Sequence, residues 1–275
     1  MSGQTVKAKI YRFDPSKDKE PYYEEFDVPM EKNMVVMGVL DYIHDNYRSD
    51  LAYRWFCGVK KCGQCGVMVN GKPGLACWEP VSPQMTIEPL RNFKVIRDLV
   101  VDRAKYDTII SEAKLHMERK KPYPGFPEPL EHSKMKATFE LEACIECGIC
   151  MAACPTLTKQ HFADKQPFES FIGPTAMVQI AKYSLDPRDE ADRFDLLMKG
   201  HIEQCDSCND CGEACPLDID VLGTAIDGLR EELVNSGRYY IRWWGLIKAM
   251  PRSLRSFFKC KLGLTTGEGP RKQEH

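Results

Sequence analysis

The chain has 275 residues, a formal net charge of −2 at pH 7 and 43% hydrophobic residues. This length allows one large or two ordinary domains, and the apolar content is enough to form real cores. The near-neutral charge argues against a nucleic-acid partner, and no apolar run approaches the roughly 18 residues that a membrane span requires. The opening MSGQTVKAKIYRF lacks the apolar region of a signal peptide, so we expect a reducing compartment rather than a disulfide scaffold.

The first hundred residues predict a small domain of strands and one helix. Alternation in TVKAKIYRF predicts a half-buried strand, and EEFDVPM predicts its neighbour. Apolar residues at three- and four-residue steps in MVVMGVLDYIHDNY predict a helix. The stretch VMVNGKPGLACW predicts a hairpin around Asn70 and Gly71 whose second strand carries Cys77, and MTIEPL predicts a last strand. This order is typical of a β-grasp domain.

Cysteine spacing is the strongest chemical signal in the sequence. One group reads C-x4-C-x2-C with a distant fourth cysteine, the pattern of plant-type [2Fe–2S] sites, and two groups read C-x2-C-x2-C-x3-C-P, the bacterial pattern for paired cubane clusters. Structural zinc needs two CxxC pairs per ion and does not explain the third and fourth cysteines of each run. Twelve of the thirteen cysteines form the three groups: Cys57, Cys62, Cys65 and Cys77; Cys144, Cys147, Cys150 and Cys154; Cys205, Cys208, Cys211 and Cys215. The thirteenth, Cys260, is interpreted as a free thiol.

We expect the two cubane runs to exchange ligands, because in two-cluster ferredoxins the fourth cysteine of each run binds the other cluster. One expected set is Cys144, Cys147, Cys150 and Cys215, and the other is Cys154, Cys205, Cys208 and Cys211. In the first cysteine group, glycines at 58, 63 and 66 would let backbone N–H groups turn toward sulfur without a Cβ in the way.

After about residue 93 the pattern becomes helical, as in VIRDLVVDRAKYDTIISEAKLHM and FIGPTAMVQIAKYSL. Four prolines and one glycine in KKPYPGFPEPLEHS predict an extended surface linker. The cubane runs lie 61 residues apart and both end in Cys-Pro, which predicts an internal repeat with a helix after each run. The expected domains are residues 1–105, residues 106–236 and a tail at 237–275.

The order of these motifs resembles the iron–sulfur subunits of succinate dehydrogenases and fumarate reductases. The matching stretches are CGVKKCGQCGVMVNGKPGLAC, EPLRNFKVIRDLVVD, CIECGICMAACP and CDSCNDCGEACP, and the resemblance spans about residues 5–235. It implies an α+β protein with an N-terminal plant-type ferredoxin-like β-grasp domain and a C-terminal all-α bacterial ferredoxin-like domain. It also implies a [2Fe–2S] cluster, two further clusters, a flavoprotein (FAD) partner and a quinone at the far end of the path.

Two features depart from many members of that family. The third run has Cys208 where relatives with [3Fe–4S] lack a cysteine, so ligand count favours a second [4Fe–4S] cluster over [3Fe–4S]. Quinone-reactive relatives also carry a Trp soon after the second run and a His after the first cysteine of the third. Here TLTKQHF has no Trp, and Asp206 follows Cys205. His161 or His201 could substitute, although a solvated or core histidine is the preferred interpretation of each.

The tail is basic and amphipathic. Residues 237–262, GRYYIRWWGLIKAMPRSLRSFFKCKL, include seven basic side chains and no acidic one. A helical wheel separates the basic residues from the aromatic and aliphatic ones, a pattern of interfacial helices, and Pro251 would kink or split such a helix. Contact with an anionic membrane surface or a membrane-anchor subunit, and packing on its own domain, both stay open.

The sequence offers no nucleophile–base pair, phosphate loop or flavin fingerprint, so we expect the chain to bind no organic substrate. We interpret it as the electron-transfer subunit of an oxidoreductase, a respiratory complex of the succinate dehydrogenase or fumarate reductase type, between a flavoprotein and a quinone pool. It would lie peripherally on the cytoplasmic side of the inner membrane, next to an anchor subunit. The alternative is a relay in a soluble flavoprotein complex, such as a thiol-dependent fumarate reductase or an acyl-CoA oxidoreductase. A free ferredoxin-like carrier would need neither the two domains nor the long helical spans.

Overall fold

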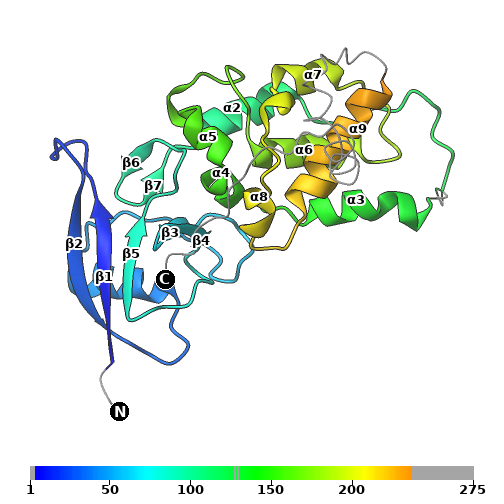
Figure 1. Ribbon diagram of the computed structural model, residues 1–275. Coiled ribbons are helices and arrows are strands. Elements are labelled where there is room, and N and C mark those ends of the chain that lie inside the picture. The colour runs from blue at the N-terminus through cyan, green and yellow to red at the C-terminus, as the bar shows by residue number, and fades with distance from the viewer. Residues whose placement is uncertain (1–3, 127, 129, 237–275) are drawn as a thin grey trace, which may run out of the picture.

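The computed structural model describes residues 4–126, 128 and 130–236, and it has an N-terminal sheet part followed by a helical part (Figure 1). In the described chain the main sheet has the order β2-β1-β5-β3-β4, with β1 antiparallel to β2 and parallel to β5. Its strands are β1 (Thr5–Arg12), β2 (Tyr22–Pro29), β3 (Gly66–Val69), β4 (Lys72–Leu75) and β5 (Gln84–Glu88). The predicted α+β class is therefore confirmed.

The core of the sheet part lies between the sheet and helix α1 (Val36–Asn46). Val6, Ala8 and Ile10 of β1 are at most 1% exposed and alternate with exposed residues, as the sequence predicts. The predicted hairpin is present, because Asn70 and Gly71 join β3 to β4 with positive φ angles of 50° and 77°. Those angles match the tight turn that right-twisted strands favour.

One expectation about this region is wrong. The helical periodicity expected from residue 95 onward begins only at α2 (Ala104–Ala113), and the preceding residues form a small antiparallel pair, β6 (Val95–Arg97) and β7 (Val100–Val101). These residues are mostly β-branched, which favours strands over helices. Backbone bonds from Asp98 N to Phe13 O and from Leu99 N to Ala52 O also tie the pair to the sheet part.

The helical part encloses a second core. Its fully buried members include Phe171, Met177 and Leu229, each 0% exposed. The remaining elements are α3 (His132–Glu142), α4 (Ile149–Ala153), α5 (Pro155–Lys159), η1 (Phe162–Asp164), α6 (Pro174–Ser184), α7 (Phe194–Lys199), η2 (Ile202–Gln204), α8 (Asp210–Glu213), η3 (Val221–Asp227) and α9 (Gly228–Asn235). Ile149 of α4 is 0% exposed and belongs to the core of the sheet part, so the two parts share apolar contacts.

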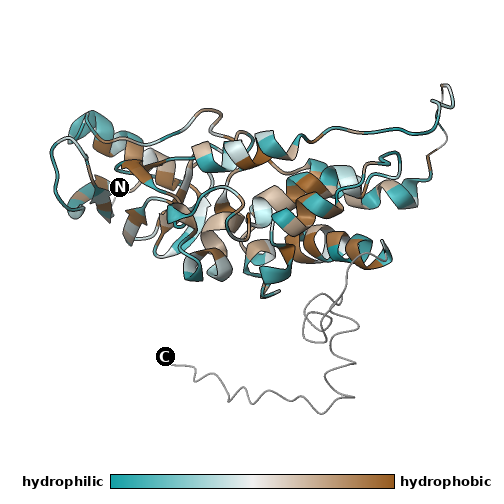
Figure 2. Ribbon diagram, turned by 90° about the horizontal axis from the view of Figure 1, so that it is seen from above, coloured by the Kyte–Doolittle hydropathy of each residue, from teal (hydrophilic) through white to brown (hydrophobic). Residues whose placement is uncertain are grey.

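The stretch between α2 and α3 runs along the outside of the helical part and is mostly hydrophilic (Figures 1 and 2), as expected for a surface linker. The Glu190 carboxylate accepts the N–H groups of Lys120 and Lys121 at 2.7 and 3.0 Å, which fixes one end of the linker. No helix within the described ranges has the length and apolar character of a membrane span. The tail interpretation and Cys260 concern residues 237–275, outside the described residues.

The two Cys-Pro steps differ, and one expectation about them is wrong. Pro155 occupies the first turn of α5, as predicted. Pro216 instead lies in a turn, and helical structure resumes only at Val221. Asp220 begins that segment because its side chain accepts the N–H of Gly223 at 2.8 Å, a capping contact that Pro216 cannot supply.

A buried carboxylate holds the loops of the sheet part together. Asp98 is 1% exposed and accepts hydrogen bonds from Arg12 Nε at 3.0 Å, Phe13 N at 2.9 Å and Ala52 N at 2.9 Å. Arg12 is itself 4% exposed and also pairs with Glu24 at 2.8 Å. Through Ala52, the carboxylate fixes the chain that leads into the first cysteine group.

Replacing Asp98 with Ala should destabilise the sheet part by about 3–5 kcal/mol, because Arg12 loses a buried partner and two N–H groups lose their acceptor. The midpoint of urea unfolding, followed by circular dichroism, measures this. Asp45→Ala is the control, since the Asp45 side chain is 74% exposed and its loss should cost less than about 1 kcal/mol. Equal midpoints for the two variants would contradict this role of Asp98.

Candidate metal centres

The first cysteine group begins in the loop between α1 and β3. The N–H groups of Val59, Lys61 and Cys62 lie 3.4, 3.3 and 3.3 Å from Cys57 Sγ. These hydrogen bonds, with those of Val59 and Lys61 the largest, lower the pKa of the Cys57 thiol to about 7. Gly58 and Gly63 both have a φ of 68°, so two of the three predicted glycines adopt a conformation that favours glycine, whereas Gly66 does not. The loop is thereby suited to hold a thiolate, the form that binds iron.

The other end of this group is buried. Cys65 and Cys77 are buried, whereas Cys57 and Cys62 are partly exposed. Burial raises the pKa of Cys65 to about 12, and its contacts with Cys77 contribute to the shift. Cys77 lies two residues beyond β4 rather than within it, because the chain turns there with Trp78 N bonded to Leu75 O.

The two cubane runs repeat one backbone geometry. In each run the residues on both sides of the second cysteine have positive φ angles. They are Glu146 and Gly148 (53° and 77°) around Cys147, and Ser207 and Asn209 (57° and 75°) around Cys208. In each run the residue two positions later also gives its N–H to that cysteine, Ile149 to Cys147 and Asp210 to Cys208. The predicted internal repeat is therefore present in the backbone.

The thiols of the two runs meet in two mixed groups. Burial raises the pKa of Cys147 to about 11, and charges at Cys144 and Cys215 add to the increase. Burial likewise raises the pKa of Cys154 to about 11, with additions from Cys205 and Cys208. The fourth cysteine of each run is thus close enough to the other run to interact with it. This proximity agrees with the crossed ligand sets, whose ligation stays a prediction.

A small cavity lies among the sulfurs of the second mixed group. It is lined by Cys154, Cys205, Cys208 and Cys211, together with apolar side chains that include Phe171, Pro174, Leu222 and Ile226. Three of these thiols are 7–9% exposed, whereas Cys208 is exposed to solvent. Four thiols around an apolar hollow fit a cluster whose irons lie between the sulfurs.

A closed zinc site is the alternative use of these cysteines. Within the described part of the chain, no three His, Cys, Asp or Glu side chains converge on the position of one metal ion. A closed tetrahedral zinc site would bring four sulfur or nitrogen atoms within about 2.3 Å of one ion. The preference for clusters over zinc rests on the cysteine spacing.

The first cysteine loop packs directly against the second at Gly63. A Cβ on Gly63 would lie 2.4 Å from Ile145 O and 3.1 Å from Cys147 Cα. A Cβ on Gly66 would lie 3.3 Å from Cys147 O. The two loops therefore approach backbone to backbone, which keeps the path between the two sites short.

Exposed apolar side chains surround the first cysteine group. Trp55, Phe56, Val59 and Trp78 are 57%, 80%, 61% and 58% exposed. The Lys60 ammonium lies 5.1 Å from the centre of the Trp78 ring. Residues 51–78 also carry four basic and no acidic side chains. Exposed aromatic residues with basic neighbours are typical of a surface that another protein covers.

A charged pair joins the stretch TLTKQHF to Asp206, the residue after Cys205. Asp206 accepts the Thr156 hydroxyl at 3.3 Å and pairs with Lys159 at 3.2 Å. Nδ1 of His201 lies 3.2 Å from Glu203 Oε1 and 3.1 Å from Gln204 Nε2. His201 thus has local polar partners, as the solvated interpretation expects.

Two buried polar residues that contact the cysteine loops were not singled out by the sequence. Thr175 Oγ1 lies 2.9 Å from Cys150 Sγ. Arg230 is 2% exposed and donates to Cys205 O at 2.9 Å and to Ser207 Oγ at 2.7 Å. Neither residue belongs to a cysteine motif, and the apolar pattern of FIGPTAMVQIAKYSL gives no signal that Thr175 faces a thiol.

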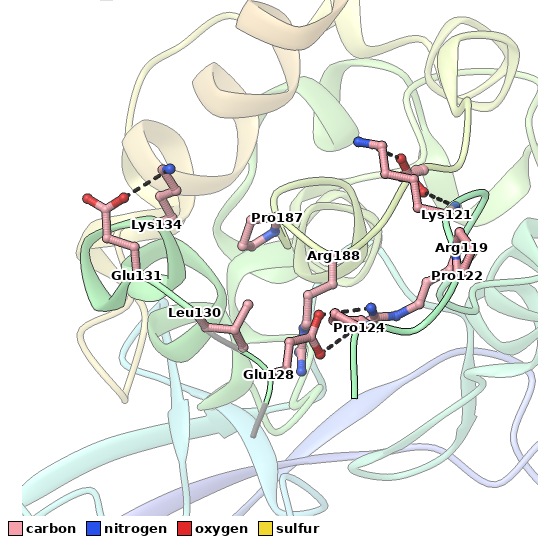
Figure 3. Close-up of a pocket in the computed structure, with 11 residues that line it drawn as sticks. Arg119, Lys121, Pro122, Pro124, Glu128, Leu130, Glu131, Lys134, Pro187 and Arg188 are labelled. Carbon is pink, nitrogen blue, oxygen red and sulfur yellow. Dashed lines mark hydrogen bonds and ion pairs between the residues drawn. The ribbon is translucent and has the colours of Figure 1, made fainter. Parts of the chain in front are cut away.

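A surface hollow away from the cysteines lies between the linker and the segment after α6 (Figure 3). Ion pairs join cationic and acidic side chains of its wall: Arg119 with Glu128 at 2.7 Å, Lys121 with Glu190 at 3.4 Å, and Lys134 with Glu131 at 2.9 Å. The described residues that line it include no cysteine. These ion pairs indicate that the hollow has a structural role and helps to hold the linker against the helical part.

Comparisons with known proteins agree with the three cysteine groups. Residues 7–108 match the family described as a 2Fe-2S iron-sulfur cluster binding domain, and residues 140–219 match a 4Fe-4S dicluster domain. The chain is 33% identical over 233 residues to the fumarate reductase iron-sulfur subunit of Haemophilus influenzae, a match that covers 78% of this chain and 88% of the relative.

Two archaeal relatives are longer. The chain is 37% identical to an uncharacterized iron-sulfur protein of Methanocaldococcus jannaschii and 32% identical to one of the subunits of the fumarate reductase (CoM/CoB) of Methanothermobacter marburgensis. These matches cover 86% and 84% of this chain but 45% of each relative, so the chain spans about half their length.

A solved structure shows the same fold. It is a chain of the Mycobacterium smegmatis Sdh1 complex in the apo form, with a TM-score of 0.75 and 24% identity, and the match covers 88% of this chain and all of that one.

Replacing Gly63 with Ala should move the first two cysteine groups apart and weaken the magnetic coupling between their clusters, because a Cβ there would collide with Ile145 O. Gly58→Ala is a matched control: Gly58 has the same φ of 68°, but a Cβ there would meet nothing within 4 Å. Both variants carry the backbone cost of a positive φ, about 1 kcal/mol. Electron paramagnetic resonance of the reduced protein should show weaker coupling between the first two clusters in Gly63→Ala only. Identical coupling in both variants would contradict the role of this contact.

Proposed function

The chain belongs to the family of iron–sulfur subunits of succinate dehydrogenases and fumarate reductases, and we propose that it carries single electrons between a flavoprotein and a second redox partner. The observation that carries the proposal is the contact at Gly63, which brings the first cysteine group against the second. The two cubane groups are neighbours as well, because Thr175 contacts Cys150 of the first group and Pro174, the residue before it, lines the cavity of the second group. Three adjacent sites form a continuous path for electrons.

We propose the following ligands. The [2Fe–2S] cluster is held by Cys57, Cys62, Cys65 and Cys77; the first [4Fe–4S] cluster by Cys144, Cys147, Cys150 and Cys215; and the second by Cys154, Cys205, Cys208 and Cys211. The second is proposed as [4Fe–4S] rather than [3Fe–4S], because Cys208 lines the same cavity as its three companions. When bound, such clusters supply one-electron redox chemistry at potentials set by ligation, hydrogen bonding and burial.

The surfaces at the two ends of the path suit different partners. The basic, aromatic surface beside Cys57 fits an acidic face of the FAD-carrying flavoprotein. At the far end, residues 202–229 carry seven acidic and no Lys or Arg side chains, and Cys208 is exposed there. The chain itself binds no organic substrate in this proposal, and its residues hold, shield and orient the electron carriers of the oxidoreductase complex.

A specific observation favours the soluble alternative for the second partner. The TLTKQHF stretch has no Trp, Asp206 rather than His follows Cys205, and Lys159 pairs with Asp206, whereas ligand pockets are mostly apolar. The relative at 32% identity is named as part of a fumarate reductase (CoM/CoB). A relay in a thiol-dependent fumarate reductase is therefore the second candidate, and quinone reduction beside a membrane anchor remains the first because of the basic tail at residues 237–262.

Substituting single cysteines tests the crossed ligand sets. Cys215→Ser should abolish the paramagnetic signal of the first cubane, whose other three ligands lie 65–71 residues earlier, and leave the [2Fe–2S] signal intact. Cys208→Ser should spare the first cubane and convert the second to a [3Fe–4S] signal. If Cys215→Ser instead spares the first cubane, the crossed pairing is wrong.

Anaerobic purification of the native complex tests the proposed function. We expect a flavoprotein to co-purify and about ten iron atoms per chain, or about nine if the last cluster is [3Fe–4S]. Recovery from membranes with an apolar anchor subunit would support the quinone-linked function, and recovery of the flavoprotein complex only from the soluble fraction would favour the second candidate. Elution of the chain alone, with no flavoprotein, would contradict both.

A further inference from the structure

The segment 171–175 lies between the two cubane cysteine sets. Phe171 and Pro174 line the same cavity as the four cysteines of the second set. One residue further, Thr175 contacts Cys150 of the first set. The turn depends on Gly173, which has a φ of 94° and whose missing Cβ would lie 2.3 Å from Met151 Sδ. Helix α6 starts at Pro174, so the position of Thr175 is fixed by both the turn and the helix.

The contact between Thr175 and Cys150 is buried and short. Thr175 is 2% exposed, Cys150 is 9% exposed, and the two side-chain atoms are 2.9 Å apart. A cysteine sulfur bound to iron has lost its proton and can only accept, whereas a threonine hydroxyl has one proton to donate. With the cluster in place, the donor is therefore the Thr175 hydroxyl.

We propose that Thr175 is a positioning residue that raises the reduction potential of the first cubane through its hydrogen bond to Cys150. Reduction adds one electron and makes the ligand sulfurs more negative, so a donated hydrogen bond stabilises the reduced state more than the oxidised state. The hydroxyl keeps its proton throughout, and only an electron moves. The inference rests on the proposed ligation of Cys150.

Burial also favours the hydrogen bond between the Thr175 hydroxyl and the Cys150 sulfur. At 2% exposure Thr175 has little access to water, and a buried hydroxyl without a partner costs about 1–3 kcal/mol. Thr138 provides the contrast in the same part of the chain, since its hydroxyl is buried in α3 and has no hydrogen-bond partner among the described residues. The two threonines are matched in burial, at 2% and 4% exposure, and differ in their contact with a cysteine.

The test is a redox titration of the anaerobically purified complex, followed by electron paramagnetic resonance. Thr175→Val removes the donor and keeps the shape of the side chain, Thr175→Ser keeps the donor, and Thr138→Val is the matched control. We expect Thr175→Val to shift the midpoint potential of the first cubane to more negative values. Thr175→Ser should stay close to the wild type, and Thr138→Val should leave all three clusters unchanged.

Each outcome distinguishes an effect of the Thr175 hydroxyl on the first cubane from an effect of how the side chain packs. Thr175→Val that binds a full first cubane and titrates like the wild type would overturn the proposal, as would an equal shift in Thr175→Ser. If Thr175→Val fails to retain the cluster, Thr175→Ser decides: retention with an unshifted potential supports the hydroxyl, and loss overturns it. A wild-type protein without a [4Fe–4S] signal would overturn the ligation of Cys150 itself, so the two failures are distinguishable.

Discussion

The backbone contact between Gly63 and the segment 145–147 constrains the rest of the structure. It requires a residue without a Cβ, a hairpin that presents the first cysteine loop, and a second loop held at a matching distance. Ile149 supports the same arrangement, because it extends from the start of α4 into the core of the sheet part. Apolar packing at Ile149 and the backbone contact at Gly63 therefore both hold the sheet part against the helical part.

Burial of the thiols affects how iron can bind to them. Burial is the main reason why the pKa values of Cys65, Cys147 and Cys154 are raised to about 11–12, so without iron these groups would be protonated at neutral pH. Iron binding must displace those protons, which makes cluster assembly pH-dependent and couples it to folding. The crossed proximity of the two runs adds to this coupling, since each mixed group draws on both halves of the helical part.

Features with a covalent or periodic signature could be predicted from the sequence, and features set by tertiary contact could not. Cysteine spacing indicated the sites, and the alternation in β1 indicated its buried face. The periodicity of the stretch that begins at residue 95 suggested a helix, but residues 95–101 form a pair of strands that is bonded to the loops at Phe13 and Ala52. Pro216 gave the same local signal as Pro155, yet it lies in a turn, and the next helical segment begins at Val221, where the Asp220 side chain caps it. Periodicity also cannot reveal which side chain faces a sulfur, so Thr175 and Arg230 emerged only from the fold.

The exposure of Cys208 has a consequence for durability. Its three companions are buried at 7–9% exposure, so solvent would reach a cluster held by these four cysteines at one corner. Dissolved oxygen and peroxide would attack there first, because oxidative damage follows thiolate character and access. In the proposed function, the chain would then lose the site at one end of its path while the two other sites stay loaded, so electrons could no longer pass between its two redox partners. Air-damaged protein would accordingly be blocked at that end of the path, while the basic, aromatic surface beside Cys57 stays intact.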